Sequence, residues 1–243
     1  MEAQLNATQG LAYERFAAVD TRNKFGGRDA RVDHGAALGC ALSHVKLMRA
    51  AVQRHHDAGG GNTTHLILED DFSFRPDALT TFRRLGDLML AFEREGVAWD
   101  VIMCSVHMAH TRAFVDSNGR NWSDPAEDGG RGISVRRILK AQTTSCYMVN
   151  GGYAPKLLSN FMHSAKRIQS AERLPSRKQS EKHKRVRAHV DAAIDIHWRF
   201  LQEKDAWFVL WPVGGEQSKS YSDIEKRAVD YSTIPLSSDH HHL

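Results

Sequence analysis

The sequence lacks the features that mark membrane, secreted and disulfide-stabilised proteins. No apolar stretch approaches the ~20 residues that a membrane-spanning helix needs. The first sixteen residues contain no apolar core of the signal-peptide type. We therefore expect a chain without a membrane span. Its compartment is left open, with the cytoplasm as the default.

Cysteine is scarce, and no two cysteines form a CxxC pair. Such a small, odd and scattered set indicates neither a zinc site nor a disulfide framework, and it favours buried free thiols. The three cysteines are Cys40, Cys104 and Cys146.

The composition is that of a folded protein, with 41% hydrophobic and 26% charged residues in a chain of 243. We expect a single domain over residues 1–243, with a flexible tail from about residue 225. The net charge is only +4, but nine Lys or Arg residues and two acids lie between His163 and His189. This basic segment either attracts an anionic partner or is a solvated loop.

Apolar stripes at helical spacing alternate with short apolar runs. The stripes predict helices over residues 39–58, after Pro76, from Ala154 and over residues 190–204. Predicted strands are 65–70, 99–106, one or two within 136–150, and 206–211. Continuous apolar strands alternating with helices predict an α/β fold, with a mostly parallel central sheet and helices on both faces.

An acidic block, Glu69-Asp70-Asp71, follows the first predicted strand directly. In open α/β sheets, ligands bind beyond the carboxyl ends of the strands. Side chains alternate in an extended chain, so Glu69 and Asp71 are expected on one side, where they could hold Mg²⁺ or Mn²⁺. Alternatively, the acids cap the next turn or pair with Arg75.

Several motifs, in order, resemble glycosyltransferase family 25, which includes lipopolysaccharide glycosyltransferases and collagen galactosyltransferases. The likeness extends from Tyr13 to Ile224 and rests on the combination of motifs. These are "YERFAAVD" (13–20), "GAALGCALSH" (35–44), "LILEDD" (66–71), "AQTTSCYMVN" (141–150), "VDAAID" (190–195) and "WPVGGEQSKSYSDI" (211–224). Members of that family usually begin with a further strand, and this sequence starts after it, so the first strand is expected to be missing or replaced.

The resemblance implies a GT-A type fold, a nucleotide-sugar donor and transfer with inversion at the anomeric carbon. It further implies that Glu69 and Asp71 hold the metal against the donor diphosphate, while Asp70 approaches the ribose or the sugar. Asp191 matches the family's aspartate and is the candidate general base. Asp195, one helical turn later, is its rival.

Other polar residues near the motifs are candidate donor or acceptor contacts. Ser43 and His44 are expected in the first turns of a helix, where an anion could bind, although His44 could equally be a hydrogen-bonded packing residue. Thr143, Thr144 and Ser145 begin a strand and could bind the donor or satisfy local backbone. Further candidate contacts are Gln217, Ser218 and Ser222 on the tail, Trp122 as a platform for a sugar ring, and Lys166, Arg167, Arg177 and Lys178 for a phosphate.

The leading hypothesis is a metal-dependent inverting transferase that moves a hexose, galactose above all, from a UDP-sugar to a hydroxyl of a glycan or glycosylated protein. Such an enzyme would act in carbohydrate biosynthesis with Mn²⁺ or Mg²⁺ as cofactor. The alternative is a non-catalytic polyanion-binding module that uses the basic segment. Nucleic acid is a poor candidate partner because the basic segment lacks interleaved aromatic residues. A metal-dependent phosphoesterase would want more His and Asp ligands at several strand ends.

Overall fold

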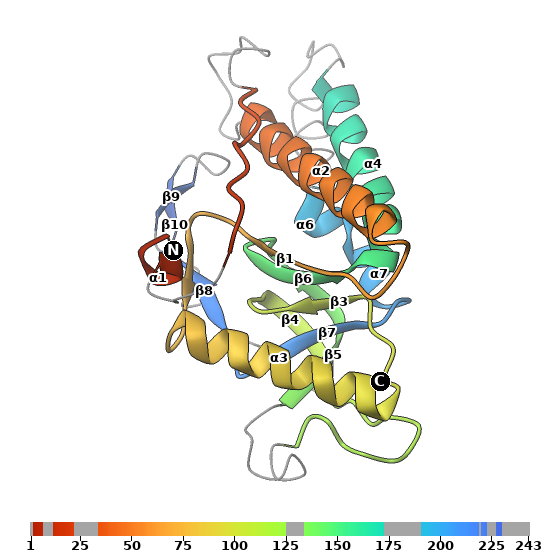
Figure 1. Cartoon of the computed structure of the whole chain (residues 1–243). Coiled ribbons are helices and arrows are strands. Elements are labelled where there is room, and N and C mark those ends of the chain that lie inside the picture. The colour runs from red at the N-terminus through yellow and green to blue at the C-terminus, as the bar shows by residue number, and fades with distance from the viewer. Residues whose placement is uncertain are drawn as a thin grey trace, which may run out of the picture.

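A six-stranded sheet forms the centre of the molecule, with helices on both faces (Figure 1). In this computed structural model the described residues are 2–6, 12–21, 34–124, 134–172, 191–218, 220–222 and 227–229. The strand order is β1-β6-β3-β7-β5-β4. The strands are β1 (Thr64–Leu68), β3 (Val101–Met103), β4 (His107–Arg112), β5 (Ser134–Gln142), β6 (Cys146–Asn150) and β7 (Trp207–Trp211).

The predicted α/β class is confirmed, but the predicted mostly parallel sheet is wrong. Among the described strands only the β3–β7 pair is parallel, and the other pairs of the sheet are antiparallel. Strand β6 lies between β1 and β3 and runs opposite to both. Its residues 146–149 are all buried, so its apolar run reports burial on both faces and gives no information about direction.

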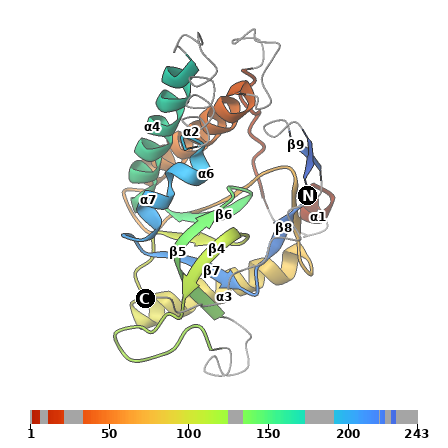
Figure 2. The same ribbon diagram turned by 180° about the vertical axis from the view of Figure 1, so that it is seen from behind.

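Helices α2 (His34–Asp57) and α4 (Ala154–Glu172) cover one face, together with the short helices α6 (Ile194–His197) and α7 (Arg199–Gln202) (Figures 1 and 2). Helix α3 (Ala78–Glu95) covers the opposite face. Each face has its own apolar core. The predicted arrangement of helices on both faces is therefore confirmed.

The predicted helical stripes are the buried faces. Ala41, Val45 and Met48 of α2 enter one core, and Leu85 and Phe92 of α3 enter the other. Burying each large apolar side chain contributes roughly 1.5–3 kcal/mol, so these stripes fix which face of each helix meets the sheet.

Local signals set the ends of the helices. The Asp77 carboxylate accepts from the Thr80 backbone N–H at 2.8 Å and caps the start of α3. Gly96 ends α3 with φ 66°. After α2, Gly59 and Gly60 adopt φ 69° and 73°, which confirms the predicted glycine stop. None of the helices in the described part is both long and apolar enough to span a membrane.

The predicted helix over residues 190–204 is two short helices, α6 and α7. Ala193 precedes α6 with ψ 140°, an extended conformation, so helical structure begins only at Ile194. Asp191 therefore lies in a turn ahead of the helix.

Two small sheets complete the fold. Strand β2 (Phe72–Phe74) pairs with β8 (Gly215–Gln217), and β9 (Ser220–Ser222) pairs with β10 (Arg227–Val229). Helix α1 (Glu2–Asn6) lies beside β8, and the 3₁₀ helix Gly151–Tyr153 leads into α4. Strand β10 belongs to the tail predicted to be flexible, and residues 230–243 lie outside the described part.

The N-terminal segment 12–21 runs along α2. Val19 N–H donates to Ser43 Oγ at 2.9 Å, and Thr21 Oγ1 donates to the Gly35 carbonyl. A Cβ on Gly39 would lie 2.6 Å from Val19 O, so only glycine permits this close approach.

Trp122 is buried and does not offer an exposed ring face to a sugar. Trp122 is 3% exposed, its ring packs edge-on against Phe92, and its Nε1 donates to Asp116 Oδ2 at 2.8 Å. The interpretation of Trp122 as a sugar platform is therefore wrong, because the ring belongs to the core over α3.

Candidate functional site

The acidic block lies at the sheet end where β1 finishes and β6 begins. Glu69 N–H donates to Ser145 O at 2.9 Å, and Cys104 N–H donates to Cys146 O at 3.0 Å. Ser105 and Ser145 share a hydrogen bond of 2.6 Å between their hydroxyls. The antiparallel pairing therefore brings the predicted Thr143–Ser145 group directly beside Glu69.

Glu69 is the best-anchored residue of the block. Its Oε1 lies 3.0 Å from His44 Nε2 and accepts from Thr144 Oγ1 at 2.6 Å. Burial favours the neutral acid, but the hydrogen bonds from His44 and Thr144 and the charges of His44 and His107 together outweigh it and lower the pKa of Glu69. Glu69 is therefore held as a carboxylate.

His44 is a buried residue that joins α2 to the sheet. Its Nδ1 lies 2.8 Å from the Tyr147 hydroxyl, while Nε2 faces Glu69. The interpretation of His44 and Ser43 as helix-N-terminal groups is wrong, because α2 begins at His34. Ser43 Oγ donates to Gly39 O at 2.8 Å, so Ser43 holds the N-terminal segment against the helix.

Asp71 is joined to the C-terminal tail. Gln217 Nε2 donates to Asp71 Oδ2 at 2.6 Å, and Ser218 donates through both N–H and Oγ to Asp71 O at 2.7 Å. Burial raises the pKa of Asp71 to about 6, and the charges of Glu69 and Asp70 add to the rise. Its Oδ1 is buried and has no hydrogen-bond partner within the described residues.

The block turns rather than continuing as a strand. Phe72 N–H donates to Glu69 O at 3.2 Å, so the strand alternation used to place Glu69 and Asp71 on one side does not apply. Asp70 is exposed. Arg75 pairs with Glu216, and Asp77 caps α3. Within the described residues, the acidic block therefore neither pairs with Arg75 nor caps the helix that follows.

The Thr143–Ser145 segment adopts an unusual backbone. Thr143 has φ 85°, a value that a β-branched residue rarely adopts. Its Oγ1 donates to Ser145 Oγ at 3.1 Å and accepts from Ser145 N–H at 3.2 Å. This conformation turns the Thr143 N–H toward Asp195 and the Thr144 hydroxyl toward Glu69.

Asp195, rather than Asp191, lies near the acidic block. Burial raises the pKa of Asp195, the nearby Arg199 opposes the rise, and the charge of Glu69 adds to it. Asp191 is exposed, and the structure gives it no hydrogen bond or ion pair with another described residue. The structure thus places Asp71 and Asp195 each within electrostatic reach of Glu69 and leaves Asp191 facing solvent.

Sequence reasoning missed three neighbours of Glu69. Cys40 precedes His44 by four residues, so both lie on one face of α2, and Cys40, His44 and Glu69 have donor atoms within 4.8 Å of one another. Tyr147 binds His44. His107 is close enough to interact electrostatically with Glu69 and to hydrogen-bond Gln217. The spacing of Cys40 and His44 was the only signal available in the sequence.

The remaining predicted contacts are dispersed or not described. Lys166 and Arg167 are exposed on α4, and Ser222 lies in β9 of a separate small sheet. Arg177 and Lys178 lie outside the described residues. The candidate site therefore consists of the acidic block, Thr143–Ser145, Asp195 and the Gln217–Ser218 turn.

The donor set of this site fits a hard divalent cation. The charge of Glu69 acts on both Asp71 and Asp195, and Asp71 Oδ1 is buried without a described partner. Carboxylate oxygens are the ligands that Mg²⁺ and Mn²⁺ prefer. A cation among them would relieve the repulsion and supply the partner that Asp71 Oδ1 lacks.

Comparison with known proteins adds no family assignment. No protein-family model matches the sequence, and no curated protein is significantly similar to it. The functional proposal therefore rests on the sequence motifs and on the geometry of their residues.

Proposed function

We propose that this chain is a metal-dependent inverting glycosyltransferase of GT-A-like architecture. It would transfer a hexose, with galactose favoured, from a UDP-sugar to a hydroxyl of a glycan or glycosylated protein. The ordered motifs that resemble glycosyltransferase family 25 support this proposal. The observation that carries it is Asp71 Oδ1, a buried carboxylate oxygen without a described partner, with the charges of Glu69 and Asp70 close by.

Glu69 and Asp71 would hold Mn²⁺ or Mg²⁺. The bound cation would supply positive charge for the diphosphate that leaves the sugar. Thr144 and His44 fix one oxygen of Glu69, and Gln217 fixes one oxygen of Asp71. One oxygen of each carboxylate is thereby oriented by the protein, and the other is left for the cation.

Asp70 and the hydroxyls of Thr143–Ser145 would contact the donor. Asp70 is exposed next to the two anchored acids, so its carboxylate can reach a ribose or sugar hydroxyl. Gln217 and Ser218 bring the tail onto the same block. Their role would be to hold Asp71 in place and to close one side of the donor site.

Asp191 would be the general base that removes the proton of the acceptor hydroxyl. Its carboxylate is exposed and therefore able to reach an acceptor arriving from solvent. Asp195 is less suited, because Thr143 N–H and Arg199 already engage it. A positioned base contributes typically ~10²–10⁴-fold to the rate, so Asp191→Asn should lose that factor while donor binding persists.

Calorimetry with UDP and Mn²⁺, followed by UDP release from a panel of UDP-sugars, tests the proposal. Wild type and the exposed control Asp87→Asn should bind and turn over, whereas Asp71→Asn should bind more weakly. Failure of wild type and of an N-terminally extended form to bind UDP would overturn the assignment. Salt-sensitive retention on heparin that Asp71→Asn leaves unchanged would then favour the polyanion-binding alternative.

A further inference from the structure

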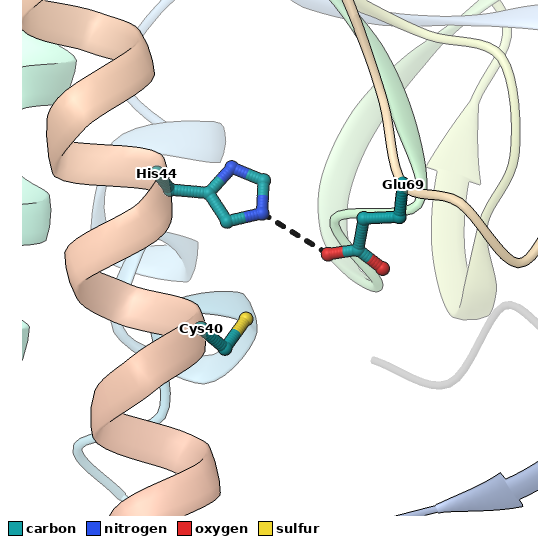
Figure 3. A group of neighbouring side chains, drawn as sticks. All are labelled: Cys40, His44 and Glu69. Atoms are coloured by element: carbon teal, nitrogen blue, oxygen red, sulfur yellow. Dashed lines mark hydrogen bonds and ion pairs between the residues drawn. The ribbon is translucent and has the colours of Figure 1, made fainter. Parts of the chain in front are cut away.

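Cys40, His44 and Glu69 offer a sulfur, a nitrogen and an oxygen donor, all within 4.8 Å of one another (Figure 3). We propose that these three residues bind one zinc ion. This donor set shares Glu69 with the all-oxygen pair of Glu69 and Asp71 but adds a sulfur and a nitrogen ligand, and the proposal does not depend on transferase activity. Thiolate and imidazole ligands favour Zn²⁺ over Mg²⁺ and Mn²⁺.

Rigid elements hold the three donors. Cys40 and His44 are four residues apart on the 24-residue helix α2, so both project from one face toward the side on which Glu69 lies (Figure 3). Glu69 follows β1 directly, and its backbone N–H is bonded to Ser145. Small adjustments of side chains suffice to close the three donors around an ion, since the backbone is already in place.

Tyr147 supplies the orientation that a histidine ligand needs. Metal-binding histidines usually engage their second ring nitrogen in a hydrogen bond, which fixes the ring and the tautomer. Here His44 Nδ1 lies 2.8 Å from the Tyr147 hydroxyl, and Nε2 points at Glu69. A hydroxyl both donates and accepts, so Tyr147 can accept from Nδ1–H and leave the Nε2 lone pair for zinc.

The surrounding charge favours a cation. The carboxylates of Glu69, Asp195 and Asp71 all lie close enough to act on the Cys40 sulfur. Zinc binding would form the sulfur–zinc bond and release the thiol proton to solvent.

Three protein ligands leave one position of a tetrahedral zinc site for water or another ligand. The sequence contains no CxxC pair and therefore did not predict zinc binding. Cys40 and His44 instead form a Cys-x₃-His pair on one helix, a spacing that a search for cysteine pairs does not detect. The site joins residues from two elements separated along the chain, so only the fold brings Glu69 to the helix.

Cobalt(II) titration of the full chain, treated beforehand with chelator, tests the proposal without any nucleotide. Cobalt takes the place of zinc and gives a thiolate-to-metal charge-transfer band in the near ultraviolet. Wild type should develop this band with one equivalent of cobalt, and zinc should abolish it by displacement. The histidines at 240–242 offer only nitrogen ligands, so the band reports on a cysteine.

Substitutions assign the band to a residue. Cys40→Ser should abolish it, whereas the matched control Cys104→Ser should retain it, with circular dichroism verifying that each variant is folded. Tyr147→Phe should keep the band but weaken zinc binding by about 10–100-fold.

Lack of the band in wild type, or a band that survives in Cys40→Ser, would overturn the zinc site. The wild-type result decides the matter even if a variant fails to fold. Loss of the zinc site would leave the Mn²⁺-dependent binding of UDP to be judged by its own experiment.

Discussion

Gln217 Nε2 lies 2.6 Å from Asp71 Oδ2, which joins the tail strand β8 to the acidic block. The other carboxylate oxygen of Asp71 is buried without a partner among the described residues. One residue thus combines an anchored oxygen with an unsatisfied one. This asymmetry makes Asp71 the most informative position of the site for mutagenesis.

Asp71→Asn should change how stability depends on pH. Folding raises the pKa of Asp71 from 3.8 to about 6, so between these values the folded state holds a proton that the unfolded state releases. The contribution of protonated Asp71 to the free energy of unfolding is therefore complete below pH 3.8 and is lost as pH rises through about 6. Asp71→Asn should gain up to about 2 kcal/mol relative to wild type between pH 4 and pH 7, allowing for partial exposure.

Urea unfolding of both proteins with chelator present measures this difference. Asp87→Asn, on the exposed face of α3, serves as the control and should follow wild type at every pH. Parallel stability curves for wild type and Asp71→Asn would show that folding does not perturb this carboxyl.

Gly39→Ala should destabilise the protein by about 1–3 kcal/mol through overpacking. The added Cβ would lie 2.6 Å from Val19 O and 3.2 Å from Thr21 Oγ1, and would push the segment 12–21 off α2. Gly86→Ala is the matched control in α3, where a Cβ meets nothing within 4 Å. It should stabilise by up to about 1 kcal/mol because alanine is the better helix former.

Thermal melts and limited proteolysis of the two glycine variants provide the measurement. Gly39→Ala should also be cut more readily within residues 12–21. Equal stability of the Gly39 and Gly86 variants would mean that the N-terminal segment does not pack on α2 as described.

His44→Ala should destabilise by about 3 kcal/mol, because Tyr147 and Glu69 would both lose a buried hydrogen-bond partner. Tyr147→Phe removes one of these two bonds and should cost about 1 kcal/mol. Equilibrium unfolding of the single and double variants gives the coupling energy. Strictly additive effects would contradict the shared hydrogen bond, since contacting residues are expected to couple.

Thr143→Gly should separate stability from function. Glycine tolerates φ 85°, and relief of the strain offsets the lost hydroxyl contacts, so the free energy of unfolding should stay within about 1 kcal/mol of wild type. Affinity for UDP with Mn²⁺ should fall because the Thr144 hydroxyl is no longer held against Glu69. The control Thr64→Gly, at the exposed first residue of β1, should lose about 0.5–1 kcal/mol of stability and keep its affinity.

Chemical denaturation and calorimetry distinguish the two threonine variants. A large loss of stability in Thr143→Gly would indicate that the hydroxyl contacts, rather than the backbone conformation, dominate at this position.

Periodicity predicted the elements well because it reports burial. The stripe of α2 and the apolar run of β7 are buried as expected. Strand direction was not predictable, since β6 is as apolar as its neighbours and yet runs opposite to β1 and β3. Trp122 was misread for a related reason: composition gives no sign that its polar stretch folds back over α3.

The candidate site was predictable where it is continuous in sequence. Glu69 and Asp71 lie at the end of a strand, as their position after an apolar run indicated. Their hydrogen-bond partners come from α2, from residues 143–145 and from the tail. These partners are far away in the sequence, so no local pattern could predict the contacts. Helix boundaries mattered as well, because the start of α2 at His34 moved His44 from a helix end into its interior.

Insertion of β6 between β1 and β3 has a consequence for any molecule that reaches this end of the sheet. Because β6 is antiparallel to both neighbours, the loops that follow β1 and β3 lie at the same end of the sheet as the loop that precedes β6. Carboxylates from the loop after β1 therefore lie beside hydroxyl and amide hydrogens from the loop before β6. A ligand at this end of the sheet would encounter negative charge and neutral donors side by side, as an assembly of cation and polyol requires.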